Sequence, residues 1–126
     1  MAQPPEAARV VGFGGFFFRA LDPQALASWY VQNLGVSLSP TSYNEKPWMQ
    51  GAGPTVFEPC SADTTFFDTD KQFMLNFRTK DLGALVAHLR ANGVEVVVDE
   101  TAYPNGHFAQ LSDPEGNPIQ LWQPAP

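Results

Sequence analysis

Apolar and aromatic runs predict a β-strand at the start of each half of the chain. Residues Gly12 to Ala20 and Gln72 to Thr79 are rich in aromatic and aliphatic side chains, as strands are. After each run, the apolar positions change to the three- and four-residue spacing of an amphipathic helix. The helical positions are Leu26, Tyr30 and Leu34 in the first half and Leu82, Leu85, Val86 and Leu89 in the second. The pattern therefore predicts a strand followed by a helix, twice along the chain.

Residues that favour helix ends flank both predicted helices. Asp22 has the side chain of an N-cap, and Pro23 follows at the first helical position, where a missing N–H costs nothing. Asp81 is the corresponding N-cap of the second helix. Gly35 and Gly93 follow the apolar stripes and suit the left-handed residue that ends a helix. Two amphipathic helices in a chain rich in strand-forming residues imply a sheet that they cover, which is an α+β fold.

The two halves also resemble each other letter by letter. Residues 16–26 read FFFRALDPQAL and residues 75–85 read LNFRTKDLGAL, so that Phe, Arg, Asp, Ala and Leu recur at the same places. The repeat has an offset of about 59 residues. Short strand–helix units can agree by chance, but the shared order of strand, Asp, helix and Gly favours an internal duplication.

Three more strands are expected after each helix. In the second half they are Val94 to Asp99, Phe108 to Ser112 and Ile119 to Trp122, with turn sequences at residues 104–106 and 113–117. In the first half the matching segments are Val36 to Pro40, a segment near Trp48 to Gln50, and Thr55 to Glu58. Strand boundaries are open between residues 39 and 53, where Pro, Gly and polar residues dominate. We therefore expect one domain over residues 9–124, built from a β-α-β-β-β module at about 9–59, a connection at 60–71 and a second module at 72–124.

Charge and length exclude several classes of partner. The 126 residues include 7 basic and 13 acidic side chains, giving a net charge of −6. Nucleic-acid binding needs clustered Lys and Arg, which are absent, so no nucleic-acid partner is expected. The apolar stretch from Val10 to Phe18 is too short to span a bilayer, so no membrane partner is expected either. Cys60 is the single cysteine and fits a reducing compartment, which predicts a cytoplasmic protein.

Three stretches of this sequence resemble the vicinal oxygen chelate superfamily, which contains glyoxalase I, extradiol dioxygenases and bleomycin resistance proteins. The closing segment GHFAQLSDPEGNPIQLWQP is similar to the superfamily's last hairpin, in which DP, an acidic residue and GN connect two strands. FFFRALDPQALASWYVQNLGV and FMLNFRTKDLGALVAHLRANGVEV are similar to the starts of its two modules. The resemblance implies paired βαβββ modules whose curved mixed sheet forms a cup covered by two helices. It also implies a homodimer, because members of the superfamily often complete their cups across two chains.

The resemblance implies four positions for metal ligands, and this chain departs from the superfamily there. They correspond to Gly15, Met74, Gln120 and, in the segment from Val56 to Glu58, Glu58. Divalent metals of this kind prefer imidazole and carboxylate ligands. The expectation is therefore that no conventional metal and no other cofactor is bound. The alternative is a divalent metal at a reduced site formed by Glu58 and Gln120, with His107 recruited to it.

The same register predicts which side chains line the cup. Strand alternation puts Met74, Asn76 and Arg78 on one face of their strand and Gly15, Phe17 and Arg19 on the matching face of the first module. The predicted ligand-binding residues are Phe17, Trp48, Met74, Asn76, His107, Gln120 and Trp122. Such a lining suits a small, uncharged or partly aromatic molecule held by a few polar anchors. The alternatives are that these residues fill a closed barrel, and that His107 is an exposed loop histidine.

Two functions from different classes follow. The first is a small-molecule binding protein of the bleomycin resistance type, working without a metal. The second is a lyase or isomerase related to lactoylglutathione lyase, which would use a divalent metal at the reduced site. A purely structural interaction module is supported only by the acidic surface. Because fold membership does not establish chemistry, the sequence leaves open whether a reaction is catalysed and which molecule is bound.

Overall fold

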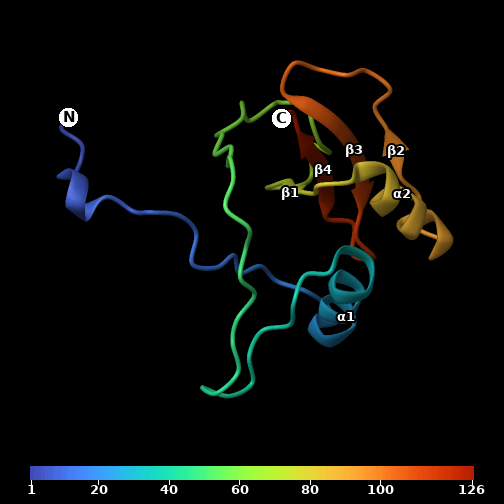
Figure 1. Ribbon diagram of the computed structural model, residues 1–126, viewed down its shortest axis with the longest axis horizontal. Helices are drawn as coiled ribbons and strands as arrows, with labels where there is room; N and C mark the ends of the chain where they lie inside the picture. Colours follow the sequence, from blue (N-terminus) through green and yellow to red (C-terminus); the bar gives the residue numbers. More distant parts are fainter.

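The computed structural model describes all residues from 1 to 126. Its sheet has four strands in the order β1-β4-β3-β2, with β1 parallel to β4 and the other neighbours antiparallel. The elements are η1 (Glu6–Ala8), α1 (Pro23–Leu34), β1 (Leu75–Arg78), α2 (Leu82–Ala91), β2 (Val97–Val98), β3 (Gly106–Ser112) and β4 (Pro118–Pro124). Figure 1 shows the sheet and both helices gathered in one body, with the N-terminal segment extending away from it. The α+β fold class is thereby confirmed.

The second half of the chain forms the predicted β-α-β-β-β module. Its four strands follow the expected order, although β1 and β2 are shorter than the apolar runs that predicted them. The turn at residues 113–117 joins β3 to β4 in a hairpin whose register runs from Gly106 opposite Pro124 to Ser112 opposite Pro118. Because side chains alternate along each strand, this register fixes which residues share a face.

Both helices begin and end as their sequences predict. The Asp22 carboxylate accepts a hydrogen bond from the Ala25 N–H (3.1 Å), and the Asp81 carboxylate accepts one from the Ala84 N–H (3.0 Å). Gly35 ends α1 with φ of 71°, a left-handed conformation that glycine adopts without a steric penalty. Neither helix combines the length and the apolar character needed to cross a membrane.

The hydrophobic core lies between the helices and one face of the sheet. Leu89, Ile119 and Leu121 are its most deeply buried large side chains. The core residues are Leu26, Tyr30, Leu82, Val86, Leu89, Val96, Ala109, Leu111, Ile119 and Leu121. Residues that alternate with these on β3 and β4 point to the other face, which no helix covers. We call this uncovered side the open face of the sheet.

The four strands expected in the first half are absent from this structure. Residues 12–20, 36–40, 48–50 and 55–58 contain no strand, and no backbone hydrogen bond joins them to the sheet. Pro40, Pro47, Pro54 and Pro59 punctuate the later segments, and proline cannot donate to a strand ladder. An extended run becomes a strand only when a partner accepts its hydrogen bonds, and apolar patterning does not supply that partner.

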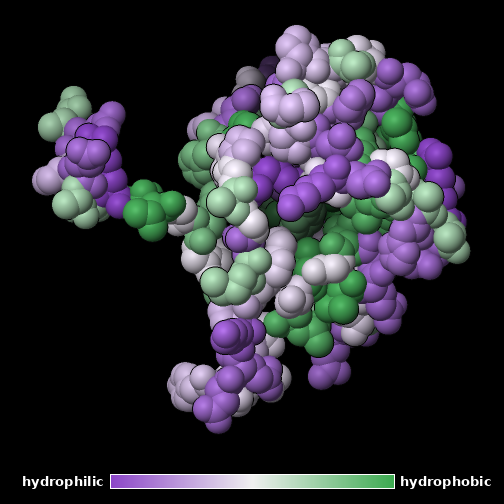
Figure 2. All heavy atoms as spheres, in the orientation of Figure 1, coloured by the Kyte–Doolittle hydropathy of each residue, from purple (hydrophilic) through white to green (hydrophobic).

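The unpaired first-half segments leave hydrophobic side chains at the surface. Val10, Val11, Phe17 and Leu21 are each more than nine-tenths exposed, and Phe13 and Phe57 are exposed while their rings lie 6.0 Å apart. Figure 2 shows strongly hydrophobic residues on the N-terminal arm, outside the body. The sheet is consequently open at the free edge of β1.

Candidate functional site

A row of amide side chains crosses the open face. The register places Asn76 on β1 beside Gln120 on β4, and Gln120 opposite Gln110 on β3. The Asn76 Nδ2 group donates to the Gln120 Oε1 atom at 2.7 Å. Gln110 is exposed, and its side chain makes no hydrogen bond within the chain. The row therefore offers neutral donors and acceptors to an occupant of this face.

A second row, next to the first, is aromatic. Trp122 on β4 lies opposite Phe108 on β3, and the two rings are nearly parallel, with centroids 6.1 Å apart and planes at 2°. Tyr103 meets the Phe108 ring edge-on at 5.8 Å. The Trp122 Nε1–H donates to the Asn105 carbonyl at 2.8 Å, which fixes the indole ring. Arg78 on β1 completes the row, because it pairs in register with Trp122.

The absence of a side chain at Gly106 leaves room for the Trp122 ring of the aromatic row. Gly106 has φ of 131°, a conformation that side chains disfavour. A Cβ atom added there would also lie 2.9 Å from the Trp122 Nε1 atom and collide with the Gln123 carbonyl oxygen. Glycine at the start of β3 is therefore needed for the position of the Trp122 ring.

The aromatic row ends at Asp99, whose carboxylate already accepts two hydrogen bonds within the chain. The Asp99 N–H donates to the Phe108 carbonyl at 3.0 Å, which places Asp99 beside Phe108 at the β2 edge. Its carboxylate accepts hydrogen bonds from the Thr101 N–H (3.0 Å) and the Tyr103 hydroxyl (2.8 Å). The bond from Thr101, and then the one from Tyr103, lower the pKa of Asp99, while the bond to Asp99 raises the pKa of Tyr103. The Asp99 carboxylate thus holds the Tyr103 ring in place.

Three of the predicted ligand-binding residues come together here. Asn76, Gln120 and Trp122 share the open face, and Gln120 and Trp122 are only 9% and 8% exposed. Met74 is half-buried and lies one residue before β1. Trp48 lies near the ring of Phe77, at a centroid distance of 6.4 Å, and so stands close to β1.

Phe17 and His107 lie elsewhere. Phe17 is 94% exposed and lines no site in the chain as it stands, because its segment is not paired with the sheet. His107 alternates with Phe108 on β3, so it shares the side of Ala109 and Leu111, which the helices cover. It is exposed on that side, as in the alternative of an exposed histidine, and does not enter the open face. The turn before β3 was read without the strand register, which starts at Gly106 and decides the face.

The residues at the superfamily's metal positions do not form a set that suits a divalent metal. Glu58 contacts Cys60, whose thiol lies 3.8 Å from the Glu58 carboxylate, and no hydrogen bond joins Glu58 to Gln120. Gly15 has no side chain, and the Met74 thioether suits soft metals. No group of three or more His, Cys, Asp or Glu side chains is arranged to hold a metal ion. The donor chemistry of these positions therefore does not fit a conventional centre.

The closing turn is a structural joint rather than part of the open face. Asp113 is 4% exposed and accepts from the Tyr30 hydroxyl (2.7 Å) and the Asn117 Nδ2 group (2.8 Å). Its carboxylate also accepts from the backbone N–H groups of Glu115 (2.9 Å) and Asn117 (3.0 Å). Burial first, and then the Asp113 hydrogen bond and charge, raise the pKa of Tyr30. The turn thereby ties α1 to the β3–β4 hairpin.

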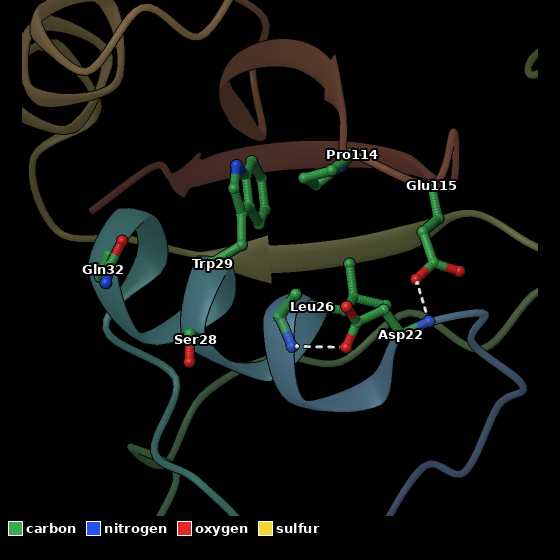
Figure 3. A pocket seen from close by; sticks show the side chains of 8 residues that line it. Asp22, Leu26, Ser28, Trp29, Gln32, Pro114 and Glu115 are labelled. Atoms are coloured by element: carbon green, nitrogen blue, oxygen red, sulfur yellow. Dashed lines mark hydrogen bonds between the residues drawn. The ribbon is translucent and has the colours of Figure 1, made fainter.

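A cavity of about 340 Å³ lies beside this joint. It is lined by Asp22, Ala25, Leu26, Ser28, Trp29, Gln32, Pro114 and Glu115. Figure 3 shows Glu115 reaching from the turn toward the start of α1, where its carboxylate accepts from the N–H groups of Leu21 (2.7 Å) and Asp22 (3.1 Å). Asp22 caps α1 with its own carboxylate. Both acids are used by the backbone, so we place the candidate site on the open face and not in this cavity.

Sequence reasoning did not select Phe108, Gln110 and Tyr103 as site residues. The signal for the first two was present, because alternation from Gln120 across the hairpin points to them once the register is known. Tyr103 lies in a loop, where no periodicity indicates the direction of a side chain.

Comparisons with known proteins agree with this architecture. The profile of the glyoxalase-like domain family matches residues 15–122, and no curated protein sequence matches the chain. TnmS3, an antibiotic binding protein from Streptomyces sp. CB03234, is 31% identical over 82% of this chain and 88% of its own, with a TM-score of 0.53. A glyoxalase/bleomycin resistance protein from the same organism is 40% identical over 41% of this chain and 46% of its own (TM-score 0.37). A glyoxalase family protein from Bacillus anthracis is 27% identical over 44% of each chain (TM-score 0.39).

The alignments with the last two proteins span less than half of their lengths, so they add little to the argument. The family profile covers most of the chain, and TnmS3 aligns with most of it at 31% identity. The resemblance read from the closing hairpin is confirmed. This chain belongs to the glyoxalase-like domain family, within the vicinal oxygen chelate superfamily.

Proposed function

We propose that this protein binds a small, partly aromatic molecule on the open face of its sheet, without a metal ion. The observation that carries the proposal is the register that sets the amide row beside the aromatic row. The half-buried Phe108 ring offers surface for stacking beside the largely buried Trp122, and the exposed amides of Asn76 and Gln110 offer hydrogen bonds at a fixed distance from it. Pockets that orient small molecules combine these features, with much apolar surface and few polar anchors.

Two further observations support binding over chemistry. TnmS3 is an antibiotic binding protein, and its alignment includes most of this chain. The open face also lacks the imidazole and carboxylate set that a metal-dependent lyase would need, since Asp99 is its single carboxylate and His107 lies on the opposite side of β3. A cytoplasmic location fits the single cysteine and is part of the same proposal.

We further propose that two copies associate, as the resemblance to the superfamily implies. The free edge of β1 presents unpaired backbone groups, and exposed edges of this kind readily pair with another chain. Val10, Val11 and Phe17 also expose nearly all of their apolar surface, which association would bury. Sedimentation equilibrium is expected to give the mass of a dimer. A monomer mass at every concentration would contradict association.

The binding proposal is tested by titrating the full chain, dialysed against a chelator, with 2-naphthamide in a calorimeter. We expect saturable binding, and Gln120→Ala should weaken it about tenfold because a hydrogen-bonding anchor is lost. Gln110→Ala should also weaken it, and this exposed side chain has no partner whose loss would disturb the fold. Gln24→Ala, an exposed amide on α1, is the matched control and should leave the affinity unchanged.

Metal content is measured on a separate sample, dialysed against buffer without a chelator. We expect substoichiometric metal and an affinity that does not respond to added zinc or nickel, because the donor set is poor. One tightly held metal per chain, lost in Glu58→Ala together with a lyase activity, would overturn the proposal in favour of the lactoylglutathione lyase-like alternative. Absence of any binding by planar aromatic probes would also overturn it.

A further inference from the structure

Arg78 brings a positive charge to the aromatic row of the open face. It is half-buried on β1 and pairs in register with Trp122, which in turn lies opposite Phe108. The strand two residues earlier carries Asn76 of the amide row, so a single occupant could contact both rows and the guanidinium. The charge therefore stands at one end of a row formed by the largely buried Trp122 ring and the half-buried Phe108 ring.

This charge has no acidic partner within the chain. The hydrogen bond that Arg78 makes is from its Nη2 group to the Gly51 carbonyl at 2.9 Å, and a neutral carbonyl does not neutralise a guanidinium. A guanidinium carries five N–H donors, so most of them are left without a protein acceptor. The acid in the same row, Asp99, is at the opposite edge of the sheet and is bound by Thr101 and Tyr103.

The segment that contains Gly51 and Gly53 passes close to the Arg78 guanidinium. A Cβ atom at Gly53 would collide with the Arg78 guanidinium, so a side chain at this position would displace it. Gly51 supplies the carbonyl acceptor two residues earlier. The two glycines let the backbone run directly against one side of the guanidinium, which fixes its position and leaves its other donors for an occupant.

We propose that the molecule bound on the open face carries a carboxylate, which Arg78 recognises while the aromatic rings of the molecule pack along the aromatic row, mainly against Phe108. This inference rests on the proposed function and replaces the uncharged ligand expected from sequence by an anionic one. A guanidinium binds a carboxylate through two parallel N–H···O bonds, a geometry that lysine cannot reproduce. The net charge of −6 opposes the approach of an anion, so the preference depends on this local contact rather than on the overall field of the protein.

The test compares two probes of nearly equal shape, 2-naphthoate and 2-naphthamide, by calorimetric titration of the full chain. We expect 2-naphthoate to bind about tenfold more tightly, as for a hydrogen bond to a charged group. Arg78→Met should abolish this difference, and Arg78→Lys should restore only part of it. Arg90→Met is the matched control, since Arg90 also donates an Nη2 hydrogen bond to a carbonyl, that of Val96 (3.1 Å), but lies on α2 away from the open face.

Each outcome decides one of the two proposals. Equal affinities of the two probes for the unaltered protein would overturn the carboxylate inference and leave the binding function intact. A preference for 2-naphthoate that persists in Arg78→Met, with an unchanged melting temperature, would also overturn it. If neither probe binds, the proposed function fails and the inference falls with it. If Arg78→Met does not fold, Arg78→Lys decides, because it keeps the positive charge but not the guanidinium: a preference for 2-naphthoate as large as in Arg90→Met would overturn the inference.

Discussion

Replacing Leu121 with alanine is expected to lower the free energy of unfolding by about 2–5 kcal/mol. Leu121 has no exposed surface and lies on β4 between Phe77 of β1 and Ala109 of β3, on the side that the helices cover. Truncation removes apolar contacts and leaves a cavity that the surrounding sheet cannot fill, because its register is fixed on both sides. A urea titration followed by circular dichroism measures the change.

Leu38→Ala is the matched control for this prediction. The side chain of Leu38 is 55% exposed and lies after α1, outside the core. The same chemical change there should alter the free energy of unfolding by no more than about 0.5 kcal/mol. Equal losses at the two positions would show that the sheet face beneath the helices is not the stabilising core.

Asp113→Ala should lower the free energy of unfolding by about 3–5 kcal/mol, since each buried donor left without its acceptor costs about 1–3 kcal/mol, although no apolar contact in the sheet changes. The carboxylate is buried and accepts four hydrogen bonds: from the hydroxyl of Tyr30, the side chain of Asn117, and the backbone of Glu115 and Asn117. Removing it leaves these donors without an acceptor and disconnects α1 from the hairpin. Asp68→Ala, at an exposed position in the connection, should have little effect in the same measurement.

Tyr30→Phe measures the hydrogen bond from Tyr30 to Asp113 separately from the other bonds that Asp113 accepts. It removes one hydrogen bond and should cost about 1–2 kcal/mol, and the loss should shrink when Asp113 is already alanine.

The raised pKa of Tyr30 means that the folded chain keeps the phenol proton at a pH where the unfolded chain loses it. Stability is therefore complete below the ordinary tyrosine pKa of about 10 and falls as the pH rises above it. Tyr30→Phe should reduce that alkaline loss, leaving only the smaller part due to Tyr103. If the free energy of unfolding fell as steeply at alkaline pH in Tyr30→Phe, burial of the Tyr30 hydroxyl against Asp113 would be contradicted.

The sequence determined the parts of this protein whose causes are local. An N-cap acts over three residues, so Asp22 and Asp81 could be assigned to the helix starts that they occupy, and Gly35 to a helix end. Apolar period and turn sequences likewise located the second module. Alternation along β1 put Asn76 on one face of its strand, and the register implied by the superfamily resemblance added Gln120 and Trp122 to the same face.

Tertiary structure alone decided what depends on a partner far away in the chain. Tyr30 and Asp113 are 83 residues apart, and no local pattern pairs them. The Arg78 guanidinium meets Gly51 across 27 residues. The first-half strands were predicted from the same apolar signal as those of the second half, yet only the second half found hydrogen-bonding partners within the chain. The hydrophobic pattern of a segment predicts which of its side chains would be buried if it paired as a strand. The backbone groups that would accept and donate its hydrogen bonds belong to another segment, whose position is fixed only when the chain folds.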